Sequence, residues 1–106
     1  MRLSDDGSTV TLDLHGARVD DAVDLLRRTV AAAADRGRAT VRVVHGSSTS
    51  DRLARNHTIK HAIHDLLDDH ALPDVTSDFR SDTYALLSLG LGGRRDPRRL
   101  TLRDVW

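Results

Sequence analysis

Residues 9–45 change their hydrophobic period twice, and this change constrains the fold more than any other feature of the chain. Residues 9–15 alternate between apolar and polar side chains, which is typical of a half-buried strand. Apolar residues then recur at helical spacing from about 19 to 36, and residues 39–45 have the pattern of a second strand. A strand, a helix and a strand in this order predict a βαβ unit with parallel strands and a right-handed crossover.

The helix between these strands has recognisable ends. Asp20 and Asp21 fall in its first turn, where negative charge complements the helix dipole. Gly37 is a typical C-terminal stop, because glycine adopts the left-handed conformation at low cost. Arg18 stands where an oxygen-bearing cap is preferred, so we expect the helix to begin without a side-chain cap.

The remaining chain predicts one more helix and further strands. We expect the helix over residues 56–70, with an alternative start near Asp51. It should end at Leu72-Pro73, because proline restricts the residue before it. Three candidate strands follow, at residues 75–80, 83–89 and 100–105. We expect the last two to pair as a hairpin.

This order of elements indicates an α/β fold class, more closely an α+β two-layer sandwich. The predicted order is β-α-β-α-β-β with an extra C-terminal strand, and both helices should lie on one face of a mixed sheet. Residues 1–8 are polar and are expected to form a flexible lead-in. Residues 9–106 suit a single domain with a modest core, in which residues 92–106 form an Arg-rich C-terminal extension.

The composition excludes several kinds of protein and of site. Without cysteine the chain has no disulfide or thiolate chemistry, and a zinc site would need histidine and aspartate. No apolar run reaches the length of a membrane span and the N-terminus has no signal-peptide core, so we expect a soluble, cytoplasmic protein without a membrane partner. Base-stacking platforms are not expected, because the only aromatic residues are Phe79, Tyr84 and Trp106.

The charged residues are of unusual types. Every acidic residue is aspartate, and every basic residue except Lys60 is arginine. A GC-rich genome would produce this bias without a functional cause, whereas phosphate binding would also favour arginine because its guanidinium binds phosphate bidentately. Arginines crowd the C-terminal segment, at Arg94, Arg95, Arg98, Arg99 and Arg103. Such a patch can bind phosphate even though the formal net charge of the chain is +0.

The two predicted parallel strands end in the same dipeptide, His15-Gly16 and His45-Gly46. Asp13 lies two residues before His15, so both side chains project from the same face of the strand. Ligands collect at the carboxyl ends of parallel strands, where glycines and helix N-termini can bind phosphate. We therefore predict a site with catalytic candidates Asp13, His15 and His45. The candidate phosphate-binding or nucleic-acid-binding residues are Gly16, Gly46, Ser47, Ser48, Thr49, Arg52, Arg55 and Lys60.

These residue types suit phosphodiester cleavage. Histidine titrates near neutral pH, so one imidazole could accept a proton while the other donates one. Asp13 could stabilise an imidazolium or hold a divalent metal such as Mg²⁺ or Mn²⁺. RNA cleavage would need no metal, whereas DNA cleavage would favour a metal-bound water. In the alternative, Asp13 only caps the turn and the histidines are surface residues. His45 also shares strand parity with the apolar Val41 and Val43.

Two further features have simpler interpretations. His57, His61 and His64 share a helix face with Asp68, and this spacing could ligate zinc. The same helical geometry places that face opposite the apolar stripe, so we expect a solvated face and no metal site there. Trp106 is expected to be a packing anchor.

Four stretches carry a resemblance to a known family: Leu12-Asp13-Leu14-His15-Gly16, Val19-Asp20-Asp21-Ala22, Val43-Val44-His45-Gly46 and Ala62-Ile63-His64-Asp65-Leu66-Leu67. Together they resemble the Smr (small MutS-related) domain over about residues 9–89. The resemblance implies a β-α-β-α-β-β fold similar to the C-terminal domain of translation initiation factor 3. It also implies nucleic-acid binding, with nicking or RNA endonuclease activity in several branches of the family.

By this resemblance, Asp13 and His15 match the functional Asp-x-His motif of the family. His45-Gly46 matches the first half of its His/Thr-Gly-x-Gly motif, and Lys60 matches a basic position on the second helix. Ser48 replaces the second glycine of that motif, where a Cβ atom restricts the loop. Residues 47–57 also make a longer segment than in compact family members.

The sequence therefore predicts a nucleic-acid-binding domain that acts as an endonuclease on RNA or nicks structured DNA. The alternatives are a non-catalytic nucleic-acid-binding module and a phosphate-handling or protein-interaction domain. The expected partner is RNA or DNA, with the ribosome or another protein as a candidate for targeting.

Overall fold

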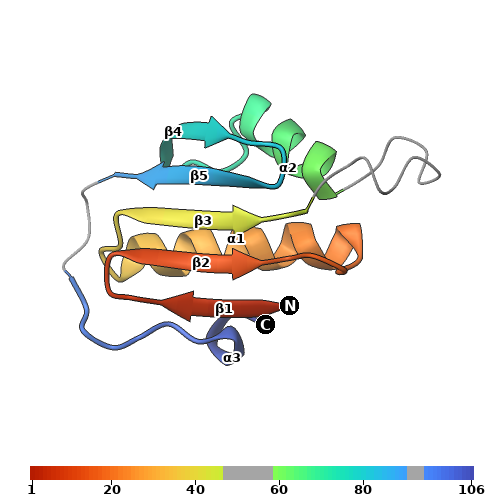
Figure 1. The fold of residues 1–106 in the computed structure, drawn as a ribbon. Helices are drawn as coiled ribbons and strands as arrows, with labels where there is room; N and C mark the ends of the chain where they lie inside the picture. Colours follow the sequence, from red (N-terminus) through yellow and green to blue (C-terminus); the bar gives the residue numbers. More distant parts are fainter. Residues whose placement is uncertain (47–58, 91–94) are drawn as a thin grey trace.

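The computed structural model describes residues 1–46, 59–90 and 95–106 (Figure 1). The predictions for Ser47, Ser48, Thr49, Arg52, Arg55, His57 and Arg94 lie outside these residues. The strands are β1 (Arg2–Asp5), β2 (Thr9–Asp13), β3 (Thr40–Val44), β4 (Val75–Arg80) and β5 (Tyr84–Leu89). The helices are α1 (Val19–Asp35), α2 (Ile59–Asp68) and α3 (Leu102–Val105).

The strands form one mixed sheet in the order β1-β2-β3-β5-β4. β2 and β3 are parallel, and α1 connects them, so the predicted βαβ unit is confirmed. The other neighbouring strands are antiparallel, including the β4–β5 hairpin. The α+β class with a mixed sheet is confirmed as well.

The helices lie on one side of the sheet and enclose the core. In Figure 1, α1 runs behind the central strands, and both α2 and α3 contact it. The side chains of Val10, Leu12, Val41 and Val43 face these helices and have no exposed surface. Burying one such aliphatic side chain contributes about 1.5–3 kcal/mol, so this face accounts for most of the stability that packing supplies. The opposite face of the sheet carries the alternate strand residues, and none of the described helices covers it.

The ends of α1 agree with the prediction. Arg18 occupies the N-cap without a side-chain hydrogen bond to the helix. Asp20 and Asp21 lie in the first turn. Gly37 follows the helix with φ +73°, a conformation that strains any residue with a Cβ atom.

Two terminal segments differ from the prediction. Residues 2–5 were expected to be part of a flexible lead-in, but they form β1, which pairs with β2 and packs Leu3 against the core. Residues 100–105 were expected to be a strand paired with residues 83–89, but residues 102–105 form α3. The Asp104 carboxylate accepts hydrogen bonds from the amide and hydroxyl of Thr101, at 2.9 and 3.0 Å, and this cap favours the helical turn.

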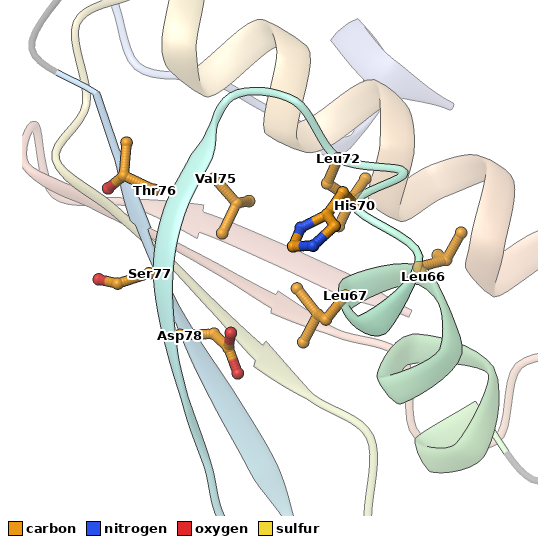
Figure 2. A pocket seen from close by; sticks show the side chains of 8 residues that line it. All are labelled: Leu66, Leu67, His70, Leu72, Val75, Thr76, Ser77 and Asp78. Atoms are coloured by element: carbon orange, nitrogen blue, oxygen red, sulfur yellow. The ribbon is translucent and has the colours of Figure 1, made fainter.

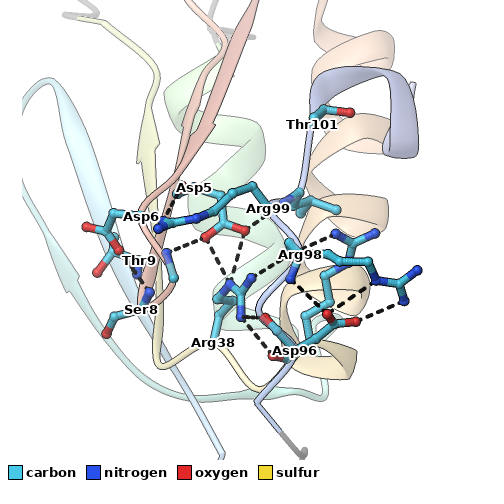
Figure 3. A network of polar contacts seen from close by, with 12 residues as sticks. Asp5, Asp6, Ser8, Thr9, Arg38, Asp96, Arg98, Arg99 and Thr101 are labelled. Carbon is cyan, nitrogen blue, oxygen red and sulfur yellow. Dashed lines mark hydrogen bonds and ion pairs between the residues drawn. The ribbon is translucent and has the colours of Figure 1, made fainter.

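A buried ion pair joins the C-terminal segment to the sheet (Figure 3). Arg38 Nε donates to both carboxylate oxygens of Asp5, at 2.9 and 3.1 Å, and neither side chain is exposed. The other guanidinium nitrogens of Arg38 donate to the carbonyl oxygens of Arg36, Asp96 and Arg98. Burial alone would raise the pKa of Asp5, but hydrogen bonds from Arg38, from the amide of Leu100 and from the amide of Gly7 outweigh it and lower that pKa.

Two arginines of the C-terminal segment, Arg98 and Arg99, lie in this network. Arg98 pairs with Asp96 at 3.0 Å, and Arg99 donates to the carbonyl oxygen of Asp5 at 2.9 Å. The hydrogen bonds from Arg98 lower the pKa of Asp96 to about 2. These contacts give the predicted basic patch a structural role.

Candidate functional site

The two His-Gly dipeptides leave neighbouring strands at the same edge of the sheet. Asp13 of β2 lies opposite Val44 of β3, and the amide of Leu14 donates to the carbonyl oxygen of Val44 at 2.8 Å. His15 and His45 therefore follow strand ends that are joined by hydrogen bonds. This arrangement is the one that the parallel βαβ unit predicts.

Gly46 and His15 are in direct contact. Gly46 has φ +82°, and a Cβ atom at this position would lie 2.8 Å from Cδ2 of His15. That distance is shorter than a carbon–carbon contact allows, so the imidazole occupies the space that any larger residue would need. The backbone conformation favours glycine here, and a larger residue would also have to displace the histidine ring.

Asp13 shapes the turn that carries His15. Its Oδ1 atom accepts a hydrogen bond from the backbone amide of His15 at 2.9 Å, which is an Asx turn. The alternative in which Asp13 caps the turn is therefore realised in the structure. Asp13 also occupies the half-buried strand position on the uncovered face, beside the exposed His15. The Asp13 carboxylate thus fixes the main chain of the turn that carries His15.

His45 lies on the other side of the sheet. Its side chain is 6% exposed, and its Nδ1 atom lies 2.7 Å from the carbonyl oxygen of Gly46. The ring meets His64 of α2 edge to face, with centroids 6.1 Å apart. The Nε2 atoms of both rings are buried and have no hydrogen-bond partner among residues 1–46, 59–90 and 95–106. His45 thus continues the alternation of β3, and its side chain points to the same side of the sheet as those of Val41 and Val43.

Burial controls the charge of this histidine pair. Desolvation lowers the pKa of His45, and the positive charge of Lys60 lowers it further. Desolvation likewise lowers the pKa of His64, with added repulsion from Arg80. Both imidazoles are therefore held in the neutral form at neutral pH.

The structure thus divides the three predicted catalytic residues into two groups. Asp13 and His15 lie at the uncovered face with Gly46, whereas His45 packs under the helices with His64. The two histidines do not face one ligand together, because β3 keeps its alternation through residue 45. Gly46 links the groups, since it contacts His15 on one side and His45 Nδ1 through its carbonyl oxygen.

The β4–β5 turn holds Gly46 in place. The carbonyl oxygen of Thr83 accepts hydrogen bonds from the amides of His45 and Gly46, both at 3.0 Å. Beside it, Lys60 Nζ donates to Asp82 Oδ1 at 2.9 Å. Lys60 therefore lies near this edge of the sheet, where its charge is paired with a carboxylate. Nothing in the sequence pattern distinguishes Thr83 from other turn residues.

His64 is the side chain whose position sequence reasoning missed. The helix face of His61, His64 and Asp68 was expected to be solvated, and His61 and Asp68 are exposed, but His64 is half-buried. His64 follows the fully buried Ile63 and so lies at the border of the apolar stripe. That adjacency is the signal that could have identified it.

The turn after β2 offers a weaker phosphate site than predicted. Gly16 has φ +83°, and among the residues that the structure describes no atom outside the neighbouring residues lies within 4 Å of where its Cβ would be, so these residues leave the backbone there open to a ligand. Asp20 and Asp21 already place two carboxylates in the first turn of α1. They would repel a phosphate at this helix N-terminus.

A small cavity lies at the other end of the sheet (Figure 2). It has a volume of about 110 Å³ and is lined by residues from the end of α2 and the start of β4. Val75 at its wall pairs with Leu89, whereas Tyr84, at the other end of β5, pairs with Val44 near the His-Gly dipeptides. Figure 2 shows His70 beside Leu67 and Leu72 in this cavity. The cavity is therefore separate from the candidate site.

Over residues 1–46, 59–90 and 95–106, no group of three or more histidine or acidic side chains could hold a metal ion. No helix in these parts of the chain is long and apolar enough to cross a lipid bilayer.

The chain matches a known protein family. The family model of the Smr domain matches residues 12–85, from the strand before His15 to the strand that follows Thr83. No curated protein matches the chain. The match covers most of the sequence and includes the contacts between the two His-Gly strand ends, and the chain therefore belongs to the Smr domain family, a nuclease-like family that binds nucleic acid.

Proposed function

We propose that this domain is an endonuclease that cleaves phosphodiester bonds in RNA or nicks structured DNA. The observation that carries the proposal is the meeting of Asp13, His15 and Gly46 at one sheet edge. There an exposed imidazole rests on a glycine backbone beside a carboxylate. The proposal extends the nucleic-acid binding that family membership implies to a specific reaction.

With RNA, His15 acts as the general base. Its imidazole takes the proton of the 2′-hydroxyl, the 2′-oxygen bonds to phosphorus, and the bond to the 5′-oxygen breaks, with that oxygen taking a proton from water. Asp13 stabilises the resulting imidazolium by its negative charge. With DNA, which has no 2′-hydroxyl, Asp13 is the residue that would help to hold Mg²⁺ or Mn²⁺, and the ion would supply an activated water.

His45 has a different role in this proposal. It is buried and neutral, and it touches Gly46 rather than the uncovered face. His45 therefore acts as a positioning residue that fixes the Gly46 main chain under His15. The proposed contacts to the sugar-phosphate backbone remain Gly16, Gly46, Ser47, Ser48, Thr49, Arg52, Arg55 and Lys60. In this proposal the domain acts in the cytoplasm, and the ribosome or another protein directs it to its substrate.

A non-catalytic binding module is the second candidate. It is favoured by the Asx turn of Asp13, because that hydrogen bond gives the aspartate a structural reason to be present. Ser48 in place of the second motif glycine favours it too. In this case the domain would bind nucleic acid in a salt-dependent way and release no product.

Labelled RNA and matched DNA, each incubated with and without EDTA, test the proposal. His15→Ala should abolish cleavage, and Asp13→Asn should reduce it strongly while keeping the Asx turn, because asparagine retains the acceptor oxygen. His70→Asn is the matched control, since it removes an exposed histidine at the other end of the sheet and asparagine tolerates the left-handed backbone found there. Cleavage by both His15→Ala and Asp13→Asn at the wild-type rate would remove this site from the mechanism. Binding without product by the wild type would establish the second candidate.

A further inference from the structure

The uncovered face of the sheet gathers two of the three aromatic residues of the chain. Phe79 of β4 and Tyr84 of β5 have ring centroids 6.4 Å apart, and the Phe79 side chain is 58% exposed. Arg42 of β3 places its guanidinium carbon 5.0 Å from the centroid of the Tyr84 ring. The small number of aromatic residues speaks against a stacking platform, but their placement on neighbouring strands assembles one.

This face has the polarity of a nucleic-acid surface. Leu86 and Val44 adjoin the aromatic pair on this face, and most of the other strand positions carry hydroxyls: Ser4, Thr9, Thr11, Thr40, Ser77 and Ser88. Asp13 is the one carboxylate among the strand positions of this face, and Arg2 and Arg42 are its cations. Exposed rings, a stacked guanidinium and hydroxyl donors are the groups with which open sheets bind the bases and phosphates of single strands.

The platform adjoins the candidate catalytic residues. Tyr84 pairs with Val44, and Val44 pairs with Asp13, so these three side chains form one row across the uncovered face. Two strand spacings separate Tyr84 from Asp13, which is about 10 Å. On the other side of Asp13, an open hollow of about 590 Å³ is lined in part by Arg2, Ser4 and Thr11. A single-stranded nucleic acid bound across the uncovered face would thus pass Asp13 and His15 before it reaches the rings of Phe79 and Tyr84.

We propose that Phe79, Tyr84 and Arg42 form a base-stacking platform that binds single-stranded nucleic acid and directs its backbone to Asp13 and His15. The inference rests on the proposed function, because it names the form of the substrate at that site. Duplexes are excluded from this mode of binding, because their base faces are already stacked inside the helix.

Fluorescence anisotropy with labelled single-stranded RNA and DNA tests the platform, in the His15→Ala background so that the probe stays intact. Phe79→Ala and Tyr84→Leu should each weaken binding at least about fivefold, since stacking on one ring is typically worth that much or more. Arg42→Gln should weaken binding and lower its salt dependence. Trp106→Leu is the matched control, because this ring is also 54% exposed but lies outside the sheet, and the affinity should not change.

A second probe separates stacking from general attraction to phosphate. An oligonucleotide of the same sequence that carries abasic sites should bind weakly to the protein with intact rings (His15→Ala alone). Its affinity should be as low as that of the intact oligonucleotide for the Phe79→Ala variant. Equal affinity for intact, abasic and duplex probes would overturn the platform, as would unchanged binding by Phe79→Ala and Tyr84→Leu. The uncovered face would then be interpreted as a surface that binds a protein partner.

The two proposals fail in distinguishable ways. If the ring variants bind normally while His15→Ala abolishes cleavage in the wild-type background, the platform is wrong and the nuclease stands. If the ring variants lose binding while the wild type yields no product, the platform stands and the domain is a binding module.

Discussion

The imidazoles of His45 and His64 meet with their ring planes at 86°, and in the described part of the chain neither buried Nε2 atom has a hydrogen-bond partner. Such a pair is stable only while both rings are neutral, because a charged imidazole in this position would be desolvated and would repel Lys60 and Arg80. Asp68 and Asp82 oppose this repulsion only in part.

The histidine pair makes stability depend on pH. The unfolded chain protonates these histidines near pH 6.5, whereas the lowered pKa values keep them neutral to lower pH in the folded state. The unfolded state therefore binds more protons below about pH 6.5, and the free energy of unfolding should fall as the pH drops from about 7.5 to about 5. Thermal melts across this range should show a smaller pH dependence for His64→Gln than for the wild type. An unchanged pH dependence in His64→Gln, or a reduced one in the exposed-site variant His70→Asn, would contradict this account.

Gly46→Ala should separate stability from activity. The positive φ costs an alanine about 1–2 kcal/mol, and the new methyl group would displace the exposed His15 ring, which can rotate away. We therefore expect a modest loss of stability and a large loss of cleavage, measured by denaturant unfolding and by product formation. Gly90→Ala is a suitable control, because its Cβ would meet only Thr76 Cγ2 at an ordinary 3.6 Å. Normal cleavage by Gly46→Ala would show that the position of His15 is not critical.

Removing one partner of the Asp5–Arg38 pair should be strongly destabilising. Asp5→Asn leaves a buried guanidinium without its counter-charge, and such changes typically cost about 3–5 kcal/mol. Arg98→Gln breaks an ion pair in which the arginine side chain is 81% exposed, and the expected loss of stability is small because solvent screens the pair. Chemical denaturation of the two variants measures the difference. Equal losses would mean that the buried pair contributes no more than a surface contact.

The cap of α3 should contribute measurably despite the shortness of the helix. Thr101→Ala removes the hydroxyl that donates to Asp104 and should cost about 1 kcal/mol. For a chain of this size that corresponds to a fall in Tm of roughly 4–8 °C. Thr101→Ser keeps the hydroxyl and should restore most of the loss. If Thr101→Ser melts like Thr101→Ala, the cap is not the cause.

The central part of the fold was predictable because its signals are local and mutually consistent. Alternation before Gly16, the helical stripe of α1 and the alternation of β3 all indicate one βαβ unit, and parallel strands then bring His15 near Gly46. The terminal elements were not predictable in the same way. β1 has one apolar residue, Leu3, facing the core, and its pairing with β2 is decided by tertiary contacts. In residues 100–105, alternation suggested a strand, but the hydrogen bonds between Thr101 and Asp104 favour a helical turn.

The site was predicted in outline and differs in its details. The contact of His15 with Gly46 follows from the topology, whereas the burial of His45 follows from strand parity and the position of α2. The packing of His64 on His45 depends on how the helix is oriented on the sheet, which its own periodicity does not determine. The aromatic platform depends on the order of β3, β5 and β4, because Arg42, Tyr84 and Phe79 come from three different strands.

The hydrogen bonds of Arg38 affect how the C-terminal segment unfolds. One guanidinium holds the carbonyl oxygens of residues 36, 96 and 98 as well as the Asp5 carboxylate, which in turn accepts from the amide of Leu100. The C-terminal segment cannot detach from the sheet without exposing the buried guanidinium of Arg38 to solvent. Its amides should therefore exchange hydrogen with solvent at rates close to those of the core strands, so that residues 96–105 unfold with the sheet in one cooperative unit instead of fraying as a tail.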